Sequence, residues 1–103
     1  MIKFCGLELS APFFLAPMAG VTDSPFRTFG AEAGASLTYT EMISAKALVY
    51  RDKKTFNLMR LWDDPAPGIV QLFGSEPEIM GEAAAIAAEV TGTPVIDINM
   101  GCP

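Results

Sequence analysis

The chain has 103 residues, seven Lys and Arg against twelve Asp and Glu, two Cys and no His, and half of its residues are hydrophobic. This composition and the net charge of −5 exclude a disordered chain, a disulfide-rich secreted module and a self-sufficient nucleic-acid binder with a basic surplus. No His is available for a metal site, so we expect a protein that binds no metal. No apolar run is long enough for a membrane span and no export signal is visible, so we expect a cytoplasmic protein that binds no membrane.

The first expected element is a small β-hairpin, made by residues 2–4 and 7–9 around Cys5 and Gly6. Cys5 is expected to pack in this hairpin and to be inert. A short strand over residues 13–16 follows, because an apolar run of this length is typical of a buried strand.

A helix comes next, with Pro25 at its first position, where a missing N–H costs nothing, and Asp23 and Ser24 as its expected caps. Gly34 is expected to end this helix. Three apolar residues share one of its faces: Phe26, Phe29 and Ala33. Arg27, in the first turn, is expected to lie on the surface or in an ion pair.

The rest of the chain continues the alternation of strands and helices. A strand is expected over residues 37–40, two helical pieces over 44–60, a loop over 62–68 and a strand over 68–73. Ser75 and Glu78 fit a capping box, which begins a helix that Gly92 ends. The apolar stripe of that helix is Ile79, Ala83, Ile86 and Val90, and a last strand is expected over 94–99.

The four apolar strands are about one βα unit apart, and their near-continuous apolarity favours a parallel sheet covered on both faces. A dinucleotide-binding fold expects GxGxxG after the first strand, whereas residues 16–21 read Ala-Pro-Met-Ala-Gly-Val. We therefore expect an α/β fold, the N-terminal half of a (β/α)8 TIM barrel with about four βα units and a hairpin that plugs the bottom. Residues 97–103 read as a strand that runs into a functional loop, so residues 1–103 are expected to be the N-terminal part of a longer domain.

In a parallel barrel, function collects at the carboxyl ends of the strands. Here those ends carry groups that suit a flat polar heterocycle. Met18 and its small neighbours allow an apolar wall and a close backbone approach, while Gln71 and Asn99 each offer a donor and an acceptor to an imide edge. Cys102 supplies a proton or a nucleophile.

Two long motifs carry a specific resemblance. Residues 15–27, Leu-Ala-Pro-Met-Ala-Gly-Val-Thr-Asp-Ser-Pro-Phe-Arg, resemble the opening signature of the tRNA-dihydrouridine synthases, and residues 97–103, Asp-Ile-Asn-Met-Gly-Cys-Pro, resemble the active-site signature of that family. Residues 40–42 and 70–74 fall at the expected strand ends between the two motifs. Dihydroorotate dehydrogenases carry a related Asn-x-x-Cys-Pro element without the opening signature.

The resemblance implies a (β/α)8 barrel that binds FMN, takes reducing equivalents from NADPH and reduces uridine in tRNA to 5,6-dihydrouridine. It implies that Pro17, Met18 and Ala19 line the flavin and that Gln71 hydrogen-bonds its ring edge. It also implies that Asn99 lies near the flipped-out uracil and that Cys102 protonates C5 after hydride reaches C6. The family has further barrel strands and a C-terminal helical tRNA-binding domain, so we expect the 103 residues alone to be inactive and tRNA binding to need the missing segments.

Two other functions stay open. One is an FMN barrel that acts on a free pyrimidine, as dihydroorotate dehydrogenases do, and the other is an inactive truncated fragment. Single residues also have structural interpretations: Cys102 as a buried structural thiol, Gln71 as an ordinary polar residue at a strand end, and Met18 as core filler. Glu41 binds a ligand or satisfies backbone donors.

Five of the seven cations lie between residues 46 and 60, opposed only by Asp52, which leaves a local surplus of four positive charges. Because this segment follows the second barrel strand, it is expected near the functional face. It is either part of a rim that contacts tRNA phosphates or an ordinary solvated surface. We call these residues the basic cluster: Lys46, Arg51, Lys53, Lys54 and Arg60.

Overall fold

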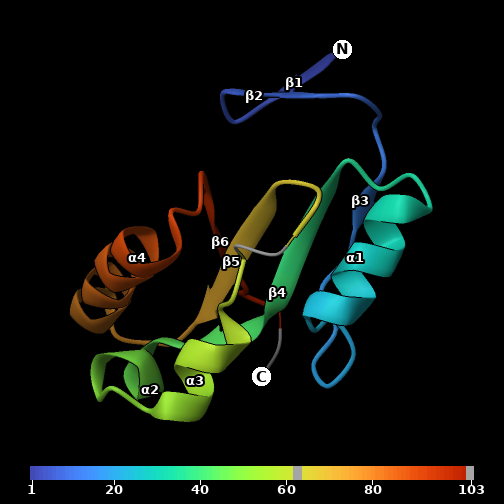
Figure 1. Ribbon diagram of the computed structural model, residues 1–103. Coiled ribbons are helices and arrows are strands. Elements are labelled where there is room, and N and C mark those ends of the chain that lie inside the picture. Colours follow the sequence, from blue (N-terminus) through green and yellow to red (C-terminus); the bar gives the residue numbers. More distant parts are fainter. Residues whose placement is uncertain (62–63, 102–103) are drawn as a thin grey trace.

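The computed structural model describes residues 1–61 and 64–101. Its elements, in chain order, are β1 (Ile2–Phe4), β2 (Leu7–Leu9), β3 (Phe14–Leu15), α1 (Ser24–Glu32), β4 (Leu37–Ser44), α2 (Ala45–Val49), α3 (Lys53–Leu58), β5 (Gly68–Phe73), α4 (Pro77–Thr91) and β6 (Ile96–Ile98). This is the expected alternation of strands and helices (Figure 1).

Strands β3 to β6 form one sheet in the order β3-β4-β5-β6, and every neighbouring pair is parallel. The prediction of an α/β fold with a parallel sheet is confirmed. Sequential order with parallel pairing means that each crossover, through α1, α2–α3 or α4, returns the chain to the next position in the sheet. All four carboxyl ends therefore lie at one edge of the sheet.

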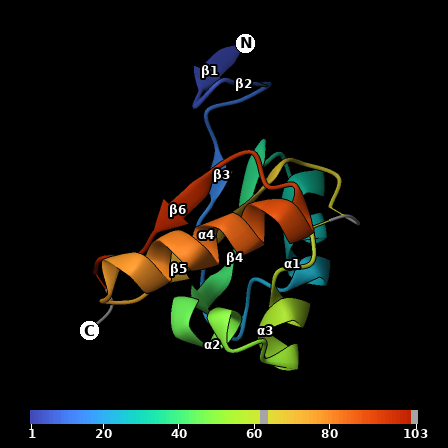
Figure 2. The ribbon, with the colours of Figure 1, turned by 90° about the vertical axis from the view of Figure 1, so that its left-hand side faces the viewer.

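One face of the sheet is covered by helices. Ile43 of β4 and Val70 and Leu72 of β5 are fully buried, and they pack in one cluster with residues of α2 and α4. Figure 2 shows α4 running across the sheet on this side. The α4 stripe is buried at Ala83 and Ile86 and leaves Val90 47% exposed at the far end.

The hairpin of β1 and β2 lies beyond the amino ends of the strands (Figure 1). Leu9 packs in a second cluster with the buried Leu37 and Ile69, and the rings of Phe4 and Phe14 meet edge to face with centroids 5.0 Å apart. These contacts attach the hairpin to the end of the sheet opposite to the carboxyl ends. At the turn, Cys5 has a φ of 48° and is exposed, so the expectation that it packs in the hairpin is wrong.

Of the two residues expected to cap α1, one does so. Asp23, and not Ser24, is the N-cap, because Asp23 Oδ1 accepts a hydrogen bond from the backbone N of Phe26 at 3.0 Å. The hydroxyl of Ser24 instead donates to Asp64 Oδ1 at 3.1 Å, a contact 40 residues away in sequence.

The capping box expected at α4 is also absent. The N-cap position is Glu76, and no side chain there accepts a hydrogen bond from the helix. Pro77 occupies the first turn and has no N–H to be capped. Gly92 ends the helix in the left-handed conformation, with a φ of 69°, as predicted.

The apolar face predicted for α1 does not pack on the sheet. Phe26 is 40% and Phe29 69% exposed, and Ala33 is exposed as well. The helix turns Gly30 toward Leu15 of β3, and Arg27 is the buried residue of this helix. A surface position for Arg27 is therefore wrong, and an ion pair is confirmed.

None of the helices in the described residues has the length and apolarity needed to cross a membrane. Among the same residues, no group of three or more Cys, Asp or Glu side chains could hold a metal ion.

Candidate functional site

Strand β4 carries an irregularity at the point where it approaches its carboxyl end. Tyr39 pairs with Ile69, but the next paired residue, Met42, pairs with Gln71, so β4 has one extra residue. Thr40 compensates for the interrupted ladder, since its Oγ1 accepts from Gln71 N at 3.1 Å and donates to the carbonyl of Glu41 at 2.8 Å. The bulge shifts the alternation of side chains, and it brings Met42 to the face that Tyr39 and Gln71 share.

Two carboxamides meet on this face. Asn99 Nδ2 donates to Gln71 Oε1 at 3.2 Å and lies 3.8 Å from the sulfur of Met42. Gln71 Nε2 donates to Asp97 Oδ2 at 2.6 Å. Gln71 is only 7% exposed, and protein partners hold both ends of its amide.

Asn99 is fixed by its own backbone as well. Its N–H donates to the carbonyl of Leu72 at 2.9 Å, which continues the pairing of β5 and β6 by one step. Its Oδ1 accepts from the backbone N of Gly101 at 3.0 Å, which turns the chain directly after the strand. The two amides therefore form a rigid pair at neighbouring strand ends.

The loop after β3, residues 17–22, approaches the same edge. Met18 is 61% exposed, and the backbone N of Gly20 donates to Glu41 Oε1 at 2.6 Å. Of the two interpretations of Glu41, the structure thus shows a carboxylate that satisfies a backbone donor. Through this contact, the end of β4 holds the loop that carries Pro17 and Ala19.

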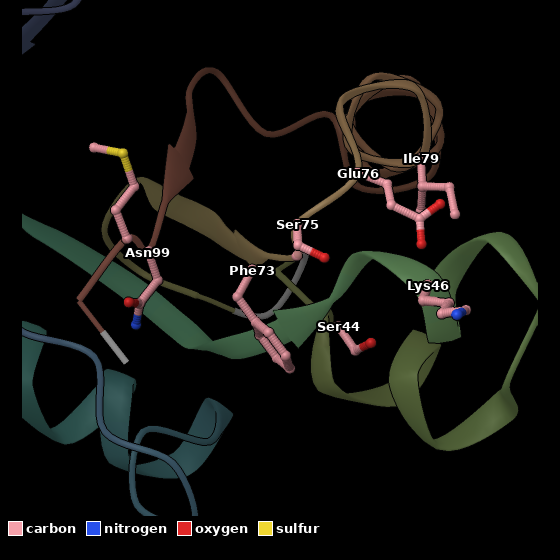
Figure 3. A pocket seen from close by; sticks show the side chains of 9 residues that line it. Ser44, Lys46, Phe73, Ser75, Glu76, Ile79 and Asn99 are labelled. Atoms are coloured by element: carbon pink, nitrogen blue, oxygen red, sulfur yellow. The ribbon is translucent and has the colours of Figure 1, made fainter. Parts of the chain in front are cut away.

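A pocket of about 580 Å³ adjoins the amide pair at the carboxyl ends of β4 and β5. In Figure 3, Asn99 and Phe73 line one part of it, and Ser75, Ser44 and Lys46 line the other. The remaining lining residues are Gly74, Glu76, Ile79 and Met100. Polar and aromatic groups around one hollow suit a planar ligand with polar edges.

Tyr39 lies on the face of the amide pair, one step closer to the hairpin. Burial raises the pKa of its phenol above 10, and the charges of Asp97 and Cys5 raise it further. The phenol therefore stays neutral at physiological pH.

The structure brings together two of the residues predicted from the sequence, Gln71 and Asn99, and it places Pro17, Met18 and Ala19 on a loop tied to β4. Cys102 lies outside the described residues. The sequence interpretation did not assign roles to Met42 and Asp97. Asp97 could have been found, because it lies two residues before Asn99 on a strand and so shares its face, whereas Met42 depends on the bulge.

The family model "Dihydrouridine synthase (Dus)" matches residues 14–103. The chain therefore belongs to the dihydrouridine synthase family.

Individual relatives agree with this assignment. The chain is 49% identical over 96 residues to tRNA-dihydrouridine synthase B of Escherichia coli K12, an alignment that covers 93% of this chain and 30% of the relative. It is 39% identical over 104 residues to a probable tRNA-dihydrouridine synthase of Rickettsia prowazekii, which covers 100% of this chain and 32% of the relative. The chain thus spans about a third of the length of these curated relatives.

Proposed function

We propose that the chain is the N-terminal part of the catalytic domain of a flavin-dependent tRNA-dihydrouridine synthase, and that β3 to β6 form the first half of a (β/α)8 barrel. The observation that carries the proposal is the Gln71–Asn99 amide pair, held at the carboxyl ends of neighbouring parallel strands. Support also comes from the relatives, which are named for the formation of dihydrouridine in tRNA.

The described residues fit FMN. A flavin has an imide edge that needs a donor and acceptors, and the amide of Gln71 offers a donor nitrogen and an acceptor oxygen to such an edge. The exposed side chain of Met18, with Pro17 and Ala19 beside it, offers an apolar wall for a flat ring. When bound and reduced by NADPH, FMN supplies the hydride that saturates the uracil at C6.

The protein's own residues supply the rest of the reaction. Asn99 hydrogen-bonds the edge of the uracil, which has to leave its stack to lie against a flat ring. Cys102 donates the proton that C5 takes up, because a thiol with an ordinary pKa of about 8.5 is mostly protonated at pH 7. Hydride at C6 and a proton at C5 together balance the reduction of the C5–C6 double bond.

The basic cluster supports tRNA as the substrate. All five of its residues are exposed, and they lie on and around α2 and α3, which follow the carboxyl end of β4. Lys46 lines the pocket itself. Cations at this edge suit the phosphates on either side of a flipped nucleotide.

The full-length protein tests the proposal. It should carry a flavin absorbance spectrum when purified, oxidise NADPH, and convert uridine to dihydrouridine in tRNA that lacks the modification. Turnover of free uracil or dihydroorotate with no activity on tRNA would instead indicate an enzyme that acts on free pyrimidines. A purified full-length protein that neither retains nor binds FMN would contradict both functions and favour an inactive remnant.

A further inference from the structure

Arg27 in the first turn of α1 is one of the most deeply buried residues of the described chain, with 1% of its surface exposed. Its guanidinium meets the carboxylate of Asp64 through two bonds, from Nε to Oδ2 at 2.7 Å and from Nη2 to Oδ1 at 3.3 Å. The Asp64 side chain is 2% exposed, so neither charge is screened by water. A buried pair is costly to desolvate and needs all its hydrogen bonds to be made.

Two further bonds of Arg27 go to backbone carbonyls of two other segments. Nη1 donates to the carbonyl of Thr22 at 2.9 Å, and Nη2 donates to the carbonyl of Arg60. One planar group thus joins α1, the end of the 17–22 loop, and the segment that leads into β5. Lysine has no fork of donors and cannot make these contacts together.

The side chain of Thr22, whose carbonyl Arg27 binds, is hydrogen-bonded to the backbone of Met18. Thr22 is 1% exposed, and its Oγ1 accepts from the backbone N of Met18 at 3.1 Å and donates to the Met18 carbonyl at 3.3 Å. The same carbonyl accepts from the backbone N of Val21 and of Thr22, both at 3.0 Å. The loop is therefore closed on Thr22.

The tip of this loop has little packing of its own. Met18, Ala19 and Gly20 are exposed, and a Cβ at Gly20 would meet no atom within 4 Å. Among the described residues, this tip is anchored by the contact of Gly20 with Glu41 at one side and by the closure on Thr22 at the other. Where hydrogen bonds rather than packing hold a loop, its position depends on the groups that hold those bonds.

We propose that Arg27 is a positioning residue that acts through Thr22 and sets the place of Met18 at the cofactor. The inference rests on the proposed function, since the ligand that Met18 faces there is FMN. Arg27 itself takes no part in the chemistry and does not touch the substrate.

The test uses the full-length protein stripped of FMN and compares FMN dissociation constants, measured by the quenching of flavin fluorescence. Thr22→Val removes the side-chain bonds to Met18 and keeps the backbone carbonyl that Arg27 binds. Thr55→Val is the matched control, because Thr55 is 6% exposed and its Oγ1 donates to Asp52 Oδ2 at 2.9 Å in a different element. We expect Thr22→Val to raise the dissociation constant about tenfold, because both side-chain bonds to Met18 are lost. Thr55→Val should lower the melting temperature by a similar amount and leave the dissociation constant unchanged.

Arg27→Lys adds a second variant, and it should weaken FMN binding at least as much as Thr22→Val. If Thr22→Val binds FMN as tightly as the wild type, the positioning role is wrong even if Arg27→Lys does not fold. If Thr22→Val and Thr55→Val weaken FMN binding equally, the effect is general destabilisation and the inference is again overturned. A wild-type protein that binds no FMN would overturn the proposed function, and the inference with it.

Discussion

The amide of Gln71 faces Asp97 with its nitrogen, at 2.6 Å from Nε2 to Oδ2. A carboxylate can only accept, so it selects one of the two orientations of the amide and leaves Oε1 to face Asn99. The orientation of a group at the functional edge is thus set by a side chain on the neighbouring strand.

Asp97→Asn should disturb this selection, because an asparagine side chain can donate as well as accept and so permits both orientations of Gln71. We expect the dissociation constant for FMN to rise about tenfold, the effect of losing a hydrogen bond to a charged group. Flavin fluorescence titration of the full-length apoprotein measures it. Asp23→Asn is the control, since either residue caps α1, and an equal effect of both changes would refute the role of Asp97.

Cys102→Ala in the full-length enzyme should retain FMN and its reduction by NADPH but lose most uridine reduction, because the proton for C5 loses its donor. Flavin bleaching in stopped flow and dihydrouridine content of tRNA separate the two steps. Cys5→Ala should affect neither, since Cys5 is exposed at the hairpin turn. Wild-type turnover of Cys102→Ala would exclude the thiol as the acid.

Charge reversal at Lys53 and Lys54 should weaken tRNA binding and reduce the slope of log affinity against log salt by about one for each lost phosphate contact. Binding isotherms at several salt concentrations give both quantities. Lys3→Glu is the matched change, because Lys3 is exposed on β1 beyond the opposite end of the strands. An unchanged salt slope in the double variant would leave the basic cluster as solvated surface.

The raised pKa of Tyr39 predicts a loss of stability in alkali. The unfolded chain releases the phenol proton near pH 10 and the folded chain only at higher pH, so the unfolded state binds fewer protons in that window and the free energy of unfolding falls as pH rises. The contribution is present below pH 10 and lost as pH rises through the folded pKa. Tyr39→Phe should therefore flatten the decline of unfolding free energy above pH 10, and an identical decline in both proteins would contradict the shift.

Two glycines of α4 should respond to Ala in opposite directions. Gly81 lies within the helix and Gly92 ends it with a φ of 69°, and a Cβ at either would meet no atom within 4 Å. Gly81→Ala should stabilise by roughly 0.5–1 kcal/mol through helix propensity, and Gly92→Ala should destabilise by roughly 1–2 kcal/mol through backbone strain. Urea denaturation of the full-length protein measures both, and a Gly92→Ala variant that is no less stable than the wild type would show that the backbone conformation of Gly92 does not matter.

The sequence predicted the sheet well, because buried parallel strands are short apolar runs that a reader can locate without tertiary information. It placed the end of β4 too early, at residue 40, since the polar residues Glu41 and Ser44 interrupt the apolar pattern. The bulge at Thr40 has no such local signal, and with it the approach of Met42 to Asn99 was not foreseeable.

Arg27 shows the other limit of local reasoning. Its partner Asp64 is 37 residues away, so the helix periodicity assigned the buried face to Phe26 and Phe29. A charged residue displaces an apolar stripe from the sheet only when a distant segment supplies the opposite charge. That information is tertiary and does not reside in the helix itself.

The extra residue in β4 has a consequence for how the strand can vary. Before the bulge, the side chains of β4 that face the cluster of Leu9 and Ile69 lie at odd-numbered positions. After the bulge, the side chains that face the amide pair lie at even-numbered positions. Deleting one residue at Thr40 or Glu41 would make the spacing from Tyr39 to Met42 equal to that from Ile69 to Gln71, so the ladder would become regular with Met42 still opposite Gln71. Deleting a residue of β4 on either side of the bulge has no such compensation and would turn the side chains beyond it to the opposite face.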